Sequence, residues 1–90
     1  MATIYKTDGT SVSIQPKNDK DFKLKEMQEI VGGYIQILDL NDGRIIVLNE
    51  EGKCDGLPYN HMATLMYRKA YNTLDFIVGD VLVCDSKQVK

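Results

Sequence analysis

The segment from residue 34 to residue 49 limits the possible folds of this chain more than any other. It reads as two strands, 34–40 and 44–49, joined by Asn41-Asp42-Gly43, whose residue types tolerate the positive φ angles of tight turns. Both strands are apolar on both faces. Such strands lie centrally in a sheet, where helices, other strands or a partner subunit cover each face. The pattern therefore predicts a central hairpin.

A more polar hairpin opens the chain. Residues 3–6 and 11–14 alternate in polarity, and Asp8-Gly9 between them is typical of a two-residue type I′ turn. Pro16 is expected to end the second strand, because proline has no N–H to give to the ladder. Three side chains of this hairpin are predicted to face the core: Ile4, Val12 and Ile14.

Two helices are predicted from apolar spacing and capping residues. The first runs from Asp19 to Val31, with Asn18 or Asp19 as its cap and Gly32-Gly33 as its end. The second runs from its cap, Asn60, to Tyr71. Its inner face is predicted to comprise Ala63, Met66, Tyr67 and Ala70.

The last strand is predicted over residues 76–84, with a bend or bulge at Gly79-Asp80. The element order is then β-β-α-β-β-α-β, which indicates an α+β fold: a small mixed or antiparallel sheet with two helices. One domain is expected over residues 1–85, followed by a polar tail, 86–90, that frays.

Composition narrows the function classes. The chain has 90 residues with 11 basic and 13 acidic side chains, a net charge of −2, so nucleic acid is not expected as a partner. No apolar run reaches the roughly 20 residues that span a bilayer. The start of the chain lacks the features of a signal peptide, and we expect a cytoplasmic protein.

Residues capable of catalysis are few. Cys54 and His61 could be imagined as a nucleophile and base, but an exposed loop thiol and a first-turn histidine explain them more simply. The chain has two cysteines, Cys54 and Cys84, and no CxxC pair, which argues against a disulfide framework or a zinc site. No catalytic residue, metal site or cofactor is predicted.

The most distinctive stretch is 49–60, which is rich in Asn, Gly and Pro. One interpretation is a well-formed turn that leads into a capped helix. The other is a binding loop, in which free amides at the helix start lie beside a lysine and could hold an anion. The candidate ligand-binding residues are Asn49, Glu50, Glu51, Lys53, Tyr59 and Asn60.

Several motifs in combination resemble one known family. They are Glu-Ile-Val-Gly-Gly-Tyr-Ile at 29–35, Asn-Glu-Glu-Gly-Lys at 49–53, Gly-Leu-Pro-Tyr-Asn at 56–60 and a glycine-interrupted strand at 78–83. Together they resemble a domain family of bacteriophages and conjugative elements, the domain of unknown function 3846. Family members tend to have Pro-Pro-Asn-Arg where this chain has Pro-Tyr-Asn-His at 58–61. The resemblance implies that the protein serves a phage or conjugative element, and it implies no mechanism.

Two functions remain open at this point. The first is a non-enzymatic accessory protein of a phage or conjugative element that binds a host or element-encoded protein, or itself as a homodimer. It is motivated by the two strands at 34–40 and 44–49, which are apolar on both faces, because a chain this short has few other elements to cover both faces. The alternative is a domain that binds or sequesters a small ligand, a nucleotide or another anion, at the 49–60 loop.

Overall fold

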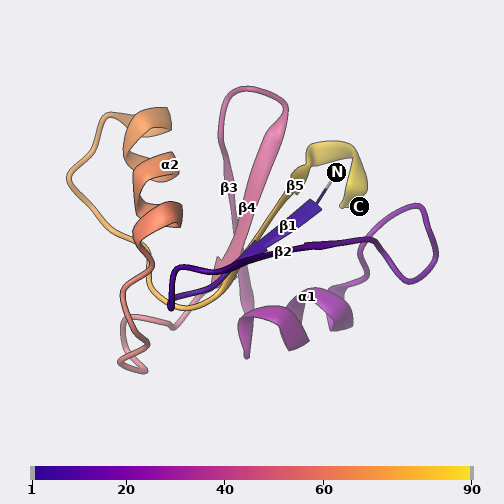
Figure 1. Cartoon of the computed structure of the whole chain (residues 1–90), viewed down its shortest axis with the longest axis horizontal. Coiled ribbons are helices and arrows are strands. Elements are labelled where there is room, and N and C mark those ends of the chain that lie inside the picture. The colour runs from indigo at the N-terminus through magenta and orange to yellow at the C-terminus, as the bar shows by residue number, and fades with distance from the viewer. Residues whose placement is uncertain (1, 90) are drawn as a thin grey trace.

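The computed structural model describes residues 2–89, and its strands form a single antiparallel sheet of five strands in the order β2-β1-β5-β4-β3 (Figure 1). The predicted α+β class is confirmed, and the element order agrees with the prediction. The elements are β1 (Ala2–Tyr5), β2 (Ser11–Ile14), α1 (Leu24–Val31), β3 (Ile35–Asp39), β4 (Arg44–Asn49), α2 (His61–Tyr71), β5 (Val81–Asp85) and the 3₁₀ helix η1 (Ser86–Gln88).

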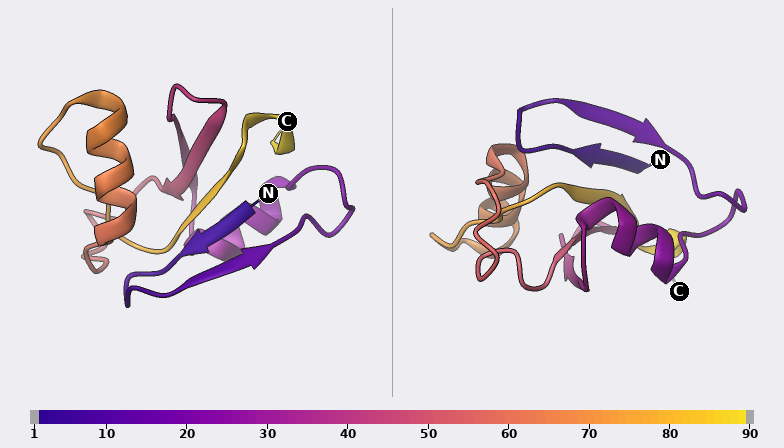
Figure 2. Two further views of the ribbon diagram at one scale, coloured as in Figure 1. Left: turned by 45° about the horizontal axis from the view of Figure 1, so that its top comes forward. Right: turned by 90° about the horizontal axis from the view of Figure 1, so that it is seen from below.

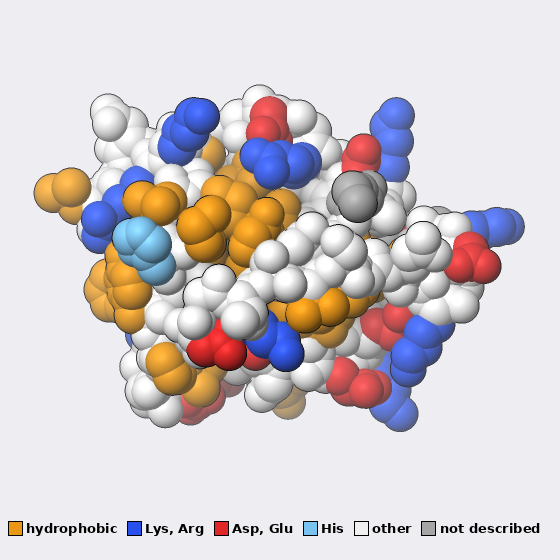
Figure 3. All heavy atoms as spheres, viewed as in Figure 1, with side chains coloured by type: hydrophobic (Ala, Val, Ile, Leu, Met, Phe, Trp, Pro, Cys, Tyr) orange, Lys and Arg blue, Asp and Glu red, His pale blue; other side chains and the backbone are white. Residues whose placement is uncertain are grey.

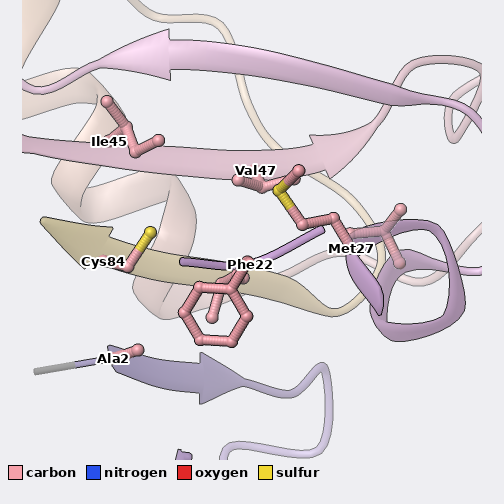
Figure 4. Close-up of a cluster of buried hydrophobic side chains, with 8 residues drawn as sticks. Ala2, Phe22, Met27, Ile45, Val47 and Cys84 are labelled. Carbon is pink, nitrogen blue, oxygen red and sulfur yellow. The ribbon is translucent and has the colours of Figure 1, made fainter. Parts of the chain in front are cut away.

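Strands β4 and β5 lie side by side and are buried on both faces. Because side chains alternate along a strand, Val47 and Leu82 point to one face and Ile46 and Val83 to the other. The first set packs with Met27 of α1, as Figure 4 shows for Val47, and we name it the α1-side core. The second set forms the α2-side core, and the two helices lie well apart in both views of Figure 2.

The prediction of a central hairpin is correct for β4 and wrong for β3. Strand β5, the last in the chain, pairs between β1 and β4 and leaves β3 at the edge of the sheet. The side chain of Ile37 in β3 is consequently 44% exposed. Strand order depends on contacts between distant segments, and local apolarity does not determine it.

Helix α1 is shorter than predicted: it begins at Leu24, after a turn at residues 17–20 and a β-bridge at Phe22. The Asn18 Oδ1 accepts hydrogen bonds from the N–H groups of Lys20 and Asp21, at 2.9 and 3.0 Å. Asp19 has a φ of 62°, which is outside the helical region. Neither predicted cap therefore caps the helix. The predicted end is confirmed, since Gly32 has the left-handed φ of 80° that favours glycine.

The first hairpin departs from its prediction in two ways. Its loop is wider than a type I′ turn: the Lys6 N–H donates to the Thr10 carbonyl at 2.9 Å, and only Gly9, not Asp8, has a positive φ. Val12 is 42% exposed rather than in the core. The reason is that α1 packs mainly over β3, β4 and β5, so it leaves this part of β2 uncovered.

The predicted bend before the last strand is confirmed, with Gly79 at a φ of 81° and β5 starting only at Val81. Residues 86–88 of the expected tail form η1, and the Phe22 N–H donates to the Gln88 carbonyl at 2.6 Å. Val89 makes a parallel bridge with Phe22, and Lys90 lies outside the described residues.

The two-sided burial of β5 predicts a large contrast between two leucines. Leu82 is fully buried, so Leu82→Ala should lower the free energy of unfolding by about 2–5 kcal/mol. Leu74 is 89% exposed, and Leu74→Ala should change it by less than about 0.5 kcal/mol. Urea unfolding followed by circular dichroism measures both. Equal effects of the two substitutions would contradict the arrangement of the sheet.

Candidate functional site

Asn49, the first of the predicted site residues, has a structural role. Its side chain is buried, and its Nδ2 donates to the Val31 carbonyl at the end of α1, at 3.2 Å. Its Oδ1 accepts from the Glu51 N–H at 2.8 Å. A Cβ at position 33 would come within 3.0 Å of this amide nitrogen, so the glycine there permits the close approach. Asn49 therefore fastens the loop to α1.

Asn60 is fully buried and is also occupied by the protein itself. Its Nδ2 donates to the carbonyl oxygens of Tyr5, at 2.9 Å, and Gly79, at 2.8 Å. Its Oδ1 accepts from the Ala63 N–H at 3.1 Å, which confirms the predicted helix cap. These contacts use both donors and an acceptor of the side chain, so Asn60 is not free to bind a ligand.

Lys53 is held by residues that the sequence did not indicate. Its ammonium lies 2.5 Å from the Asp75 Oδ1 and 4.4 Å from the centre of the Phe76 ring. The hydrogen bond from Lys53 holds the pKa of the Asp75 carboxyl below its usual range. Both groups are about half exposed, which limits the strength of the pair. An anion at Lys53 would have to compete with Asp75.

The other predicted residues lie apart from this pair. Glu50 and Glu51 are exposed, and within residues 2–89 their carboxylates make no hydrogen bond or ion pair. The Tyr59 ring lies 6.0 Å from the Phe76 ring and 6.4 Å from the His61 ring, and its 45% exposure agrees with a ring on the surface. The six residues thus do not converge on one point.

A small cavity of about 140 Å³ lies between β3, β4 and residues 75–78. Asn49, Glu50 and Lys53 line it, together with Cys54 and Asp75, whereas Glu51, Tyr59 and Asn60 do not. Ligand pockets usually have volumes of about 300–1,000 Å³. A larger hollow of about 680 Å³ lies near Pro16, away from every predicted site residue. The cavity at Lys53 has room for only a few atoms.

The structure gives no support for a Cys–His pair. Cys54 is exposed in the loop, and the ring contact found for His61 is with Tyr59. Over residues 2–89, no three His, Cys, Asp or Glu side chains are placed to hold a metal ion. Cys84 is buried in β5, and burial raises the pKa of its thiol to about 11.

Apart from Tyr59, sequence analysis missed a concentration of exposed apolar side chains on α2 and on the segments that flank it. We name it the α2 surface, and Figure 3 shows hydrophobic side chains beside His61, which is pale blue. Of the ten large hydrophobic residues that are exposed in the described chain, six belong to it. These six are Tyr59, Met62, Leu65, Tyr71, Leu74 and Phe76. Met62 and Leu65, three positions apart on the outer side of the helix, were the signal available in the sequence.

The segment that follows α2 is fastened to the helix. Arg68 donates from Nε to the Asp75 carbonyl at 2.9 Å and from its terminal nitrogen to the Leu74 carbonyl at 3.0 Å. The Ile77 N–H donates to the Thr64 Oγ1 at 2.9 Å, in the buried part of the contact. The apolar side chains of the α2 surface are therefore presented on a fixed backbone.

Two substitutions at Asn60 separate its cap from its other contacts. Asn60→Asp keeps the oxygen that caps α2 but replaces the donor to Tyr5 and Gly79, whereas Asn60→Ala removes both functions. We expect Asn60→Asp to lower the free energy of unfolding by at least about 1–3 kcal/mol, because the Tyr5 and Gly79 carbonyls lose their hydrogen-bond donor. Ala loses the cap as well but places no buried charge beside the two carbonyls, so we expect it to lower the free energy of unfolding by about 1–3 kcal/mol too. Urea unfolding measures both variants. If Asn60→Asp is as stable as the wild type, the only stabilising role of Asn60 is to cap α2.

The two thiols should differ in reactivity. The thiolate is the reactive form, and burial suppresses it at Cys84, whereas Cys54 is exposed to reagents. Titration of the native protein with a chromogenic disulfide at pH 8 should therefore detect one thiol, which Cys54→Ser removes. The second should react only after denaturation. Rapid reaction of both thiols in the native protein would contradict the burial of β5.

Comparisons with known proteins agree with the resemblance found in the sequence. No curated protein and no solved structure matches the chain. Within residues 2–89, no helix is both long and apolar enough to cross a bilayer. The family described as domain of unknown function (DUF3846) matches residues 2–89, almost the whole chain. The chain therefore belongs to the DUF3846 family.

Proposed function

We propose that the protein is a non-enzymatic binding module that acts through protein–protein contacts at the α2 surface. The setting we propose, from the family resemblance, is the cytoplasm, where it serves a bacteriophage or conjugative element as an accessory protein. One observation carries the proposal: six of the ten exposed large hydrophobic side chains lie within residues 59–76. Clustered exposed apolar side chains of this kind mark interaction sites.

The chemistry of this surface suits a protein partner. Its aromatic residues, Tyr59, Tyr71 and Phe76, are of the type enriched in interfaces, because they bury a large area with few rotatable bonds. Leu74 is 89% exposed although Arg68 holds the backbone beside it. Because the backbone there is already held, binding through Leu74 requires little further ordering of the backbone.

The charges around the surface indicate the character of the partner. Lys69 and Arg68 lie in the last turn of α2, and Lys53 lies beside Phe76. The acidic residue within 59–76 is Asp75, which is already paired with Lys53. We therefore expect a host or element-encoded protein with an apolar site and carboxylates at its rim.

A small ligand at the 49–60 loop is the second candidate, and it is supported only by the cavity beside Lys53. At about 140 Å³, the cavity is too small for a nucleotide and would suit an anion of phosphate size. Such an anion would displace Asp75 from Lys53. Asn49 and Asn60 could not take part without giving up their contacts with the backbone.

Two matched substitutions test the proposed function. Leu65→Glu places a carboxylate on the α2 surface, and Leu24→Glu places one at a similarly exposed leucine of α1; the two side chains are 48% and 56% exposed. A protein retained by the wild-type chain from bacterial lysate should bind the Leu24 variant equally. It should bind the Leu65 variant roughly 30-fold more weakly, the effect of an interface hot spot.

Affinity can be measured by biolayer interferometry with the purified partner, after circular dichroism has established that both variants fold. Equal affinity of the wild type and both variants would reject the α2 surface as the binding site. If Lys53→Ala is the only variant that loses binding, the binding site is the 49–60 loop instead.

A further inference from the structure

Strand β3 presents hydrogen-bonding groups that nothing in the described chain satisfies. The Glu50 N–H donates to the Tyr34 carbonyl at 2.8 Å, and the Leu40 N–H donates to the Arg44 carbonyl at 2.9 Å. In an antiparallel pair, residues alternate between bonding to the neighbouring strand and pointing away from it. The N–H and C=O groups of Ile35, Ile37 and Asp39 therefore point outward, and no residue among 2–89 bonds to them.

This edge also lacks the features with which proteins protect an exposed strand. Residues 35–39 contain no lysine and no proline, and their pairing with β4 runs without a bulge. Ile37 is 44% exposed, and Tyr34, just before the strand, is 66% exposed. Such an edge is suited to pairing with another strand.

The opposite edge of the sheet is different. Strand β2 has four residues, Ser-Val-Ser-Ile, and the bond between Lys6 and Thr10 places its outward backbone groups at Ser11 and Ser13. It therefore offers a shorter ladder than β3, with polar side chains at the bonding positions. Pro16 follows shortly after it. Of the two edges, β3 is the one that can extend the sheet.

We propose that two copies of the chain pair through β3, antiparallel and centred on Ile37. In this register Ile37 lies opposite its own counterpart, and Ile35 lies opposite Asp39. Each outward N–H group of one copy then lies opposite an outward carbonyl of the other copy. Every such pair of residues forms two hydrogen bonds. A shift by one residue in either copy would place outward groups opposite groups that already bond to β4. The strand is thus complementary to itself, and the two sheets become continuous.

The side chains agree with the same register. The side chain of Ile37 is on the α1 face, where it would cover its counterpart across the two-fold axis. Asp39, the charged residue of the strand, faces Ile35 rather than another carboxylate. On the α2 face, Gln36 lies opposite Leu38. No like charges oppose one another in the seam.

Self-pairing also accounts for the sequence of β3. Its apolar character on both faces predicted a covered position, which the strand lacks within one chain. A second copy would supply that cover. The inference does not depend on the α2 surface, which lies on the helix and the segment after it, but a dimer would present that surface twice.

Matched substitutions on the two edges test the proposal. Ile37→Lys places two ammonium groups opposite each other at the two-fold axis, and Val12→Lys makes the same change on β2; the original side chains are 44% and 42% exposed. In sedimentation velocity, the wild type and Val12→Lys should form a species of twice the 10.2 kDa chain mass as concentration rises. Ile37→Lys should stay monomeric at every concentration.

Hydrogen exchange of the labelled protein tests the register. The amides of Ile35, Ile37 and Asp39 should become protected as the dimer forms and lose this protection in Ile37→Lys. A wild type that stays monomeric up to millimolar concentration overturns the proposal. A dimer that persists in Ile37→Lys also overturns it. If that dimer is lost in Leu65→Glu, the contact between the two copies lies at the α2 surface instead. Pairing of β3 only with a strand of a different protein would also overturn it.

Discussion

The carboxamide of Asn60 joins three parts of the chain that lie far apart in sequence. It donates to Tyr5 at the end of β1 and to Gly79 at the bend before β5, and it caps α2. The bend directs β5 between β1 and β4, where it supplies side chains to both cores. Placement of the last strand and placement of α2 therefore depend on one buried side chain, whose hydrogen bonds are stronger for being shielded from water.

This arrangement leaves the two helices with different roles. Helix α1 packs over three strands and closes the α1-side core with Met27 and Val31. Helix α2 buries Ala63 and Thr64 and leaves Met62 and Leu65 outward. Since Thr64 and Arg68 also hold the segment after α2, the backbone that carries its exposed side chains is already in place before any partner arrives. Binding through such a surface costs little ordering entropy.

Local signals in the sequence were sufficient for the helix cap at Asn60, the helix end at Gly32 and the bend at Gly79. They failed at Asn18, whose side-chain oxygen accepts hydrogen bonds within a local turn instead of capping α1. They also failed where a distant residue decides: β5 displaces β3 to the edge of the sheet, and Lys53 pairs with Asp75. Residues 49–60 were the most distinctive stretch of the sequence, and in the structure Asn49 and Asn60 bond to backbone groups. Sequence alone does not distinguish an amide that binds a ligand from one that binds backbone carbonyls.

The central claim is that Asn49 and Asn60 support the fold while the α2 surface meets the partner. Carbene footprinting of the chain, free and in complex with the protein that it retains from lysate, tests this claim most directly. The account predicts reduced labelling of Met62, Leu65 and Leu74 in the complex, with unchanged labelling of residues 50–55. Protection confined to residues 50–55, with the α2 surface labelled as in the free chain, would contradict it.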